Sequence, residues 1–304
     1  MEDKRNTKFS YFSDMSWFDG IGTEIPFKDS FGNSLNENWE SNLPTRSDVS
    51  DIKHNSKIIP MFGDSFIYCH GLKRHYAIDA QLKKHLPDTS VINFGLPGSN
   101  NDNIIKLINQ WLNTEYAKNT SCIIVNVAPL PRYDFIFARN YHKHGVKTKN
   151  GSVPTLYDET YGNRPIVQPM NGSNRPDFVE FKSHEARIVN KIYNHFFEYL
   201  DTPINNLVSF EHYITQLKWI SKAIDKDIYF IMNDWIITNF LNRDDVDWVN
   251  SKLTEVQNTS RLKRIDLSKM HNEHTFEELY LTCGHWNEFA TKYIANVIYK
   301  QITE

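Results

Sequence analysis

Cysteine is scarce in this chain of 304 residues, which contains only Cys69, Cys122 and Cys283. The three cysteines lie far apart and lack the spacing of metal ligands, so they do not indicate a zinc site. An odd and sparse set also argues against a disulfide scaffold and fits a reducing compartment. We therefore expect no disulfide framework.

Long hydrophobic runs and an excess of one charge are missing as well. No apolar stretch approaches the roughly 20 residues of a membrane span. The first residues, MEDKRNTKFSYFSDMSWF, lack the apolar core of a Sec signal peptide, so we expect none. The net charge is -3, and no basic run suggests a tail for nucleic acid. We expect neither nucleic acid nor a membrane as a partner, and a cytoplasmic location.

Two segments show little pattern of regular structure. Residues 1–56 are rich in Gly, Pro, Asn and Ser, with scattered aromatic residues, which predicts an irregular extension. Its aromatic residues imply packing on the main domain, on another protein or on a second copy of the chain. Residues 139–180 are similar in composition and predict an irregular insert. The remaining sequence, within 57–304, forms the expected domain.

In that domain, strand patterns and helix patterns alternate. Short apolar runs predict strands at 57–63, 90–95, 121–129 and 227–235, with a weaker one at 262–267. Helical patterns cover residues 65–86, 103–112, 183–199, 206–223, 244–256 and 285–302. This alternation predicts an α/β fold with a mainly parallel sheet and helices on both faces.

A serine follows the first predicted strand in the stretch IIPMFGDSF. Ser65 would then lie at the carboxyl edge of the sheet, where ligands bind in open α/β folds. Serine is a weak nucleophile until a base such as histidine activates it. The alternative is that Ser65 caps the next helix and Gly63 makes a tight turn. The tripeptide alone favours the capping role.

Further polar residues follow the second and third predicted strands. In NFGLPGSNND, Gly98 could offer its backbone N–H to a substrate oxygen, and Asn100 could donate from its side chain, as in an oxyanion hole. Asn126, at the end of the third strand, could donate to the same oxygen. A turn in which Asn100 caps the helix explains the segment equally well. Arg132 could position a substrate carboxylate or form a structural ion pair.

His285 lies in a glycine turn just before the last predicted helix. It could fold back over the sheet edge toward Ser65, or it could be a surface histidine at a helix start. Trp235, after the fourth strand, could line a pocket or belong to the core. Two further histidine clusters, at 141–144 and 271–274, offer no clear additional ligands, so we expect no metal.

The order of these motifs resembles the SGNH (GDSL-type) hydrolase superfamily. The matching residues are, in chain order, Gly63-Asp64-Ser65, Gly98, Asn126 and His285. The resemblance spans roughly 57–304, less the insert. The Ser-Asn pair after the glycine turn and the later arginine resemble a branch common in phage and marine bacterial genomes, which implies a virion as a second possible location.

The resemblance implies a flavodoxin-like three-layer α/β/α sandwich and ester hydrolysis through an acyl-enzyme. Ser65 would attack the ester carbonyl, and His285 would accept the serine proton. The oxyanion would be held by the N–H groups of Ser65 and Gly98, with Asn126 or Asn100 as the side-chain donor. The substrate would be a small-molecule or glycan acyl ester, and no cofactor is implied. Residues that could contact the substrate are Asp64, Arg132 and Trp235.

The chain departs from the family in its final block. The family has an aspartate two or three residues before the histidine, where this chain has Thr282 and Cys283. That aspartate orients the imidazole and stabilises the imidazolium. A Ser-His dyad is one outcome, and substitution by Glu277 or Glu278 is another. A catalytically degenerate SGNH-fold protein, such as a virion or glycan-binding component, is the alternative function. An acyltransferase is a third.

Overall fold

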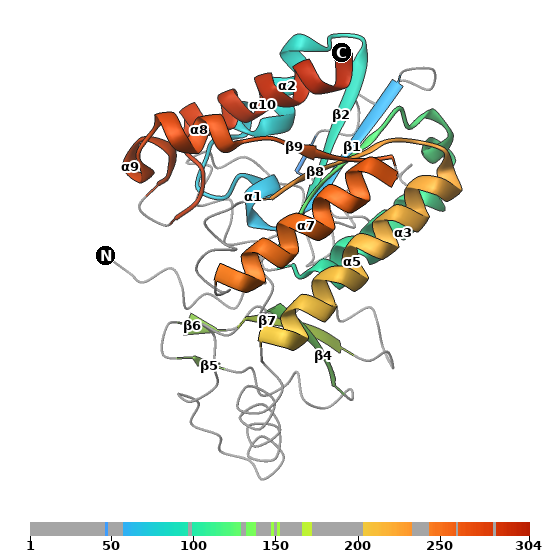
Figure 1. Cartoon of the computed structure of the whole chain (residues 1–304). Coiled ribbons are helices and arrows are strands. Elements are labelled where there is room, and N and C mark those ends of the chain that lie inside the picture. The colour runs from blue at the N-terminus through green and yellow to red at the C-terminus, as the bar shows by residue number, and fades with distance from the viewer. Residues whose placement is uncertain are drawn as a thin grey trace.

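The computed structural model contains a five-stranded sheet at its centre (Figure 1). The residues it describes are 46–47, 57–96, 99–128, 132–137, 147–148, 151–152, 166–171, 203–232, 243–259, 261–281 and 284–304. The sheet strands are β1 (Lys57–Gly63), β2 (Thr89–Gly95), β3 (Ile123–Asn126), β8 (Ile228–Ile231) and β9 (Leu262–Ile265).

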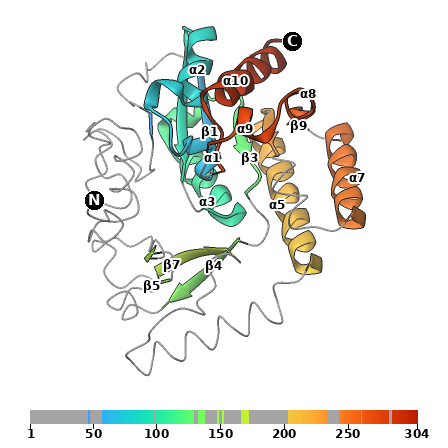
Figure 2. The ribbon, with the colours of Figure 1, turned by 90° about the vertical axis from the view of Figure 1, so that its left-hand side faces the viewer.

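All neighbouring strands of this sheet are parallel, in the order β2-β1-β3-β8-β9. Taken in chain order, this is the 2-1-3-4-5 arrangement of flavodoxin-like folds. Helices cover both faces, as Figures 1 and 2 show. The fold class predicted from the sequence is therefore confirmed.

One helical layer packs on each face of the sheet. The first layer consists of α3 (Asn101–Leu112), α5 (Pro203–Ile224) and α7 (Arg243–Thr259). The second consists of α1 (Ser65–Tyr68), α2 (Ile78–His85), α8 (Ser268–Glu273), α9 (Phe276–Leu279) and α10 (Glu288–Thr303). Helices α3, α5, α7 and α10 begin and end within about three residues of the predicted bounds, whereas α8 and α9 were not predicted. Among the described helices, none is long and apolar enough to cross a bilayer.

Successive side chains along each strand point to opposite faces of the sheet and pack into two separate hydrophobic cores. In β1, Ile58 and Phe62 pack with the first helical layer, whereas Ile59 and Met61 pack with the second. This is the period of two that strand geometry imposes. Because both faces are covered, the central strands β1, β3 and β8 are apolar along nearly their whole length, as is typical of parallel sheets.

The prediction of a single helix over residues 65–86 is wrong, because the structure has two helices separated by a 3-10 turn. Helix α1 has four residues and ends at Cys69, which adopts a left-handed conformation with φ 59° and ψ 55°. A 3-10 turn at Arg74–Tyr76 follows, and then α2. The guanidinium of Arg46 donates to the carbonyl oxygens of Tyr68, Cys69 (2.7 Å) and Leu72 (2.5 Å). This distant partner satisfies carbonyls that a continuing helix would have used.

Residues 132–171, which include most of the predicted insert, contain more strand than predicted. Strand β4 (Arg132–Phe137) pairs antiparallel with β7 (Ile166–Asn171), and β5 (Lys147–Thr148) pairs with β6 (Gly151–Ser152). Short strands separated by polar turns show only weak periodicity, which explains the miss. The helix predicted at 183–199 lies outside the described residues.

Candidate active site

The carboxyl ends of β1 and β3 lie side by side at the topological switch point of the sheet, where ligands bind in such folds. Ser65 follows β1 by two positions and is buried, with 5% exposure. Asn126 is the last residue of β3. The structure thus brings the GDS motif and the predicted asparagine together at the predicted edge.

The turn that presents Ser65 is capped by Asp64. The Asp64 Oδ1 accepts hydrogen bonds from the Phe66 N–H (2.9 Å) and from Nδ2 of Asn126 (2.9 Å). Oδ1 of Asn126 in turn accepts from the Asp64 N–H at 3.0 Å. Ser65 is the first residue of α1, so the alternative in which Ser65 caps the helix is wrong.

Two glycines allow this turn to pack closely. A Cβ on Gly63 would lie 1.8 Å from Oδ1 of Asn126 and 2.4 Å from Cγ1 of Ile67. A Cβ on Gly95, its register partner in β2, would lie 2.3 Å from the backbone nitrogen of Tyr68. Glycine is therefore required at both positions by close approach, because any side chain would push α1 away from the sheet.

His285 is held in a short loop between α9 and α10. Tyr280 and Trp286 form an antiparallel bridge, and the Leu281 N–H donates to the His285 carbonyl at 2.7 Å. Gly284, with φ 78°, supplies the left-handed residue of the loop. The loop turns the imidazole toward α1, where its ring centroid lies 5.2 Å from that of Phe66. His285 therefore folds back onto the helix that begins with Ser65.

A second histidine, His70, lies in the same place and was missed by the sequence interpretation. It is 8% exposed, and its ring centroid is 4.7 Å from that of His285. Burial lowers the pKa of His70 to about 3, and the charges of His285 and Arg46 add to this effect. Nothing in the motif distinguishes it, because its significance depends on contacts made across the fold.

The other predicted donors have structural partners. Asn100 caps α3, its Oδ1 accepting from the Asn103 N–H at 2.8 Å. Nδ2 of Asn126 donates to Asp64 and also to the Val127 carbonyl at 3.3 Å, so both of its amide hydrogens have acceptors. Asp64 is fully buried, so a substrate contact would require the turn to open. The oxyanion and substrate-contact roles of these residues remain predictions.

The two glutamates that could replace the missing aspartate lie in α9. Glu278 forms a capping box with Thr275, whose N–H it accepts at 2.8 Å. Glu277 is exposed in the first turn of the same helix. No described contact joins either carboxylate to His285. Four other candidates, Gly98, Trp235, Thr282 and Cys283, lie outside the described residues; so does the side chain of Arg132, although its backbone begins β4.

Cys69 and Cys122 are buried thiols. Burial raises the pKa of each to about 12, so neither offers a thiolate for chemistry at neutral pH. Cys69 packs as a small buried residue at the end of α1. Within the described part of the chain, no three His, Cys, Asp or Glu side chains gather as metal ligands.

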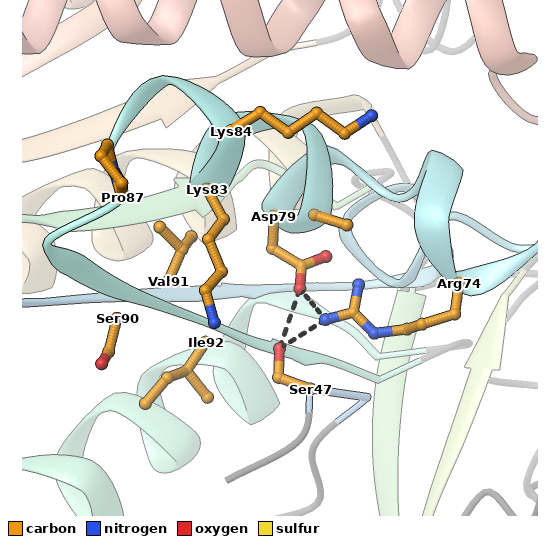
Figure 3. Close-up of a pocket in the computed structure, with 10 residues that line it drawn as sticks. Ser47, Arg74, Asp79, Lys83, Lys84, Pro87, Ser90, Val91 and Ile92 are labelled. Atoms are coloured by element: carbon orange, nitrogen blue, oxygen red, sulfur yellow. Dashed lines mark hydrogen bonds and ion pairs between the residues drawn. The ribbon is translucent and has the colours of Figure 1, made fainter. Parts of the chain in front are cut away.

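Two clefts lie near these elements. The first, of about 530 Å³, lies between α2 and the outer edge of β2 (Figure 3). Its buried carboxylate, Asp79, is paired with Arg74 and accepts from Oγ of Ser47 at 2.9 Å. The Arg46 N–H donates to the Asn93 carbonyl at 2.9 Å, so residues 46–47 cover the free edge of β2. At this point, the N-terminal segment packs on the main domain.

The second cleft, of about 570 Å³, is lined by residues that are close in sequence to the two histidines, although neither histidine lines it. Residues 71–73 form one wall, immediately after His70. Leu281 and residues 287–289 form the other wall, on either side of His285. The side chain of Phe289 is 47% exposed and gives this wall an apolar surface. The cleft is therefore the described cavity closest in sequence to the histidine pair.

Comparison with known proteins gives structural matches only. No protein-family model matches the chain, and no curated protein matches its sequence. The psychrotrophic esterase EstA from Pseudoalteromonas sp. is 11% identical, with a TM-score of 0.47 over 82% of this chain and 97% of that one. A G-D-S-L family lipolytic protein from Veillonella parvula is 12% identical, with a TM-score of 0.46 over 82% and 100%.

A putative G-D-S-L family lipolytic protein from Desulfitobacterium hafniense is 9% identical, with a TM-score of 0.45 over 81% of this chain and 99% of that one. The phage-like branch suggested by the sequence remains a prediction. The strand order and the common edge that holds the GDS turn, Asn126 and His285 rest on the coordinates of this chain. In fold and in the order of its motifs, the chain resembles the SGNH (GDSL-type) hydrolases.

Proposed function

We propose that this chain hydrolyses acyl esters, with Ser65 as the nucleophile and His285 as the general base. The observation that carries the proposal is the packing of the His285 ring on α1, 5.2 Å from Phe66, the residue next to Ser65. Asp64 caps the helix, so the Ser65 hydroxyl is not used for that purpose. A serine at the switch point of the sheet, with a histidine packed against the residue that follows it, suits nucleophilic catalysis.

The reaction would proceed in two halves. Oγ of Ser65 attacks the ester carbonyl carbon while His285 accepts the hydroxyl proton, and the carbonyl oxygen becomes an oxyanion. The intermediate collapses as the imidazolium returns its proton to the departing alcohol. Water then attacks the acyl-enzyme with His285 again as base, which releases a carboxylic acid and restores Ser65.

The oxyanion would be bound chiefly by backbone donors. The N–H groups of Ser65 and Gly98 are the proposed pair, as the family resemblance implies. The amide hydrogens of Asn126 already have acceptors in Asp64 and Val127. Asn126 would then contribute by holding the turn in shape rather than by contacting the oxyanion directly.

The proposed substrates are acyl esters of small molecules or glycans, including O-acetyl groups. The cleft of about 570 Å³ is of a size that binds small ligands. It runs between the segment that follows His70 and the loop that carries His285, which would put a bound ester close to both. The apolar ring of Phe289 suits an acyl chain or the apolar face of a sugar.

A fluorophosphonate probe tests the proposal. We expect it to label the wild-type chain at Ser65, and we expect no labelling in Ser65→Ala and little in His285→Ala. Ser121→Ala, which removes a partly buried serine two residues before β3, should be labelled normally and serves as the control. Absence of labelling in the wild type, together with no turnover of p-nitrophenyl acetate, would refute ester hydrolysis.

A non-catalytic binding protein with this fold is the second candidate. Two observations favour it. The chain has Thr282 and Cys283 where the family has its aspartate, and the carboxylate of Glu278 caps α9. The same probe separates the two functions, because a binding protein would retain the fold without an activated serine.

A further inference from the structure

Helix α5 has a stripe of weakly polar and apolar side chains on its outer surface. Among the described residues, four large apolar side chains are exposed, and two of them, Val208 (59%) and Trp219 (68%), belong to this helix. Their separation of eleven positions is about three helical turns, so they lie on one face. The members of this face, spaced three or four residues apart, are Val208, His212, Thr215, Trp219 and Ala223.

The stripe faces away from the sheet. Helix α5 lies between α3 and α7 (Figure 2). Its inner face buries Phe210, Tyr213 and Leu217 in the first core. A continuous exposed stripe that includes a tryptophan marks a surface for another molecule, because tryptophan is among the side chains that contribute most to protein interfaces.

Charged side chains of opposite sign lie along one flank of the stripe. Glu211 is in the N-terminal half of α5, whereas Lys218 and Lys222 are in the C-terminal half. Steps of seven and four residues keep all three on the same side of the helix. Glu211 lies 3.6 Å from Lys252 of α7 and is still half exposed. Its carboxylate can therefore accept a further cation.

We propose that the stripe on α5 binds a second copy of this chain in an antiparallel pair with two-fold symmetry. An axis between positions 215 and 216 brings Val208 against Ala223 of the second copy, and the ring of His212 against that of Trp219. Apolar groups thus meet apolar groups, and rings meet rings, twice in each dimer.

The charged flank selects this partner and this direction. Rotation about the two-fold axis brings the charged flanks of the two copies together, so Glu211 lies between Lys218 and Lys222 of the second copy. In a parallel pair, carboxylate would face carboxylate and ammonium would face ammonium, which is unfavourable. A bilayer is a poorer match, because interfacial helices combine a broad apolar face with a mainly basic one.

The expected dimer is weak and reversible. A single pair of helices buries less than the roughly 1,600 Å² of a standard protein interface, so we expect a Kd of the order of 10 µM. Analytical ultracentrifugation of the full chain, at concentrations on either side of that value, should show a monomer that converts to a dimer. The pairing is independent of ester hydrolysis and is measured without turnover.

Trp219→Lys tests the centre of the contact. We expect it to raise Kd at least about 10-fold, since it removes the largest side chain of the stripe. Phe276→Lys, at another exposed ring on α9, is the matched control and should dimerise as the wild type does. Circular dichroism and thermal melting establish that both variants are folded. Equal dimerisation of the wild type and Trp219→Lys overturns the proposal.

A charge exchange tests the flank. Glu211→Lys makes the flank wholly basic, and the double variant Lys218→Glu, Lys222→Glu makes it wholly acidic. Each alone should dimerise more weakly than the wild type, whereas an equimolar mixture should form the heterodimer. Mixing would not cure a variant that is merely misfolded. A mixture as weak as its components overturns the predicted charge pairing.

Cysteine cross-linking tests the register in a Cys283→Ala background. Thr215→Cys, beside the axis, should form a disulfide with its own copy under mild oxidation. Val208→Cys should cross-link with Ala223→Cys and not with itself, because the two copies of position 208 are about 22 Å apart along the helices. Self-linking of Val208→Cys overturns the antiparallel register.

A wild-type chain that stays monomeric at every concentration overturns the dimer altogether. Cosedimentation of such a monomer with phosphatidylglycerol vesicles, lost in Trp219→Lys, would assign the stripe to a lipid surface instead.

Discussion

The side chain of Asn126 and the backbone and carboxylate of Asp64 are joined by two hydrogen bonds, of 3.0 Å and 2.9 Å. This pair links the ends of β3 and β1, and it fixes the turn from which Ser65 emerges. Because both partners are buried, either one left alone would have unsatisfied polar atoms. The link is therefore the first feature of the site on which stability can be tested.

Asn126→Ala should destabilise the fold by about 2–4 kcal/mol, since it leaves the Asp64 N–H and carboxylate without this partner. Urea unfolding measures the loss. Asn113→Ala, which removes an exposed amide that donates to the Asn109 carbonyl, is the matched control and should cost less than about 1 kcal/mol. Equal losses in the two variants would show that the Asn126 pair does not hold the turn.

Gly63→Ala should lower the free energy of unfolding because the new methyl group would clash with its neighbours. The new Cβ would lie 1.8 Å from Oδ1 of Asn126 and 2.4 Å from Cγ1 of Ile67, and we expect a loss of at least about 2 kcal/mol. In an Asn126→Ala background the first clash is absent, so the same substitution should cost less there. A double-mutant cycle by urea unfolding measures this coupling. Strictly additive losses would contradict the close packing of the two residues.

Arg46→Ala should destabilise the end of α1, because three carbonyl oxygens lose their shared donor. We expect a cost of about 2–4 kcal/mol, and Arg46→Lys should recover only part of it because an ammonium lacks the planar fork of a guanidinium. Arg261→Ala, at a half-exposed surface pair with Asp225, should cost under about 1 kcal/mol. An Arg46→Ala variant as stable as Arg261→Ala would show that Arg46 does not stabilise the end of α1.

The buried thiols should be unreactive in the folded protein. Burial raises the pKa of Cys69 and of Cys122 to about 12, so the reactive thiolate is suppressed below that pH and would become the dominant form only above it. In a Cys283→Ala background, Ellman's reagent at pH 8 should modify neither thiol in the native state. Both should react in urea, and rapid modification of the native protein would contradict the burial of these residues.

Much of the fold could be predicted because its signals are local. The strands of the main sheet are short apolar runs, and helices such as α3 and α10 have clear periodicity. These features depend on neighbours in the sequence. The GDS turn and His285 are selected differently, by the order of the motifs along the chain and the family resemblance that this order carries, because each motif alone also fits a structural role.

The failures involve partners that are distant in the sequence. Helix α1 ends at Cys69 because Arg46, 23 positions earlier, satisfies its carbonyl. Asp64 rather than Ser65 became the cap because Asn126, 62 positions later, orients the carboxylate. No periodicity or propensity contains such information.

The sequence by itself determined the α/β class and the strands of the main sheet, because apolar periodicity and turn chemistry are local properties. The order of its motifs, through the family resemblance, selected Ser65 and His285 as candidates. Only the tertiary structure decided which residues stand beside them. In the folded chain, Asp64 and Asn126 hydrogen-bond to each other at the turn, and Glu278 caps helix α9. It also brought His70 against His285, since contacts between buried side chains arise only when the layers of the fold pack together.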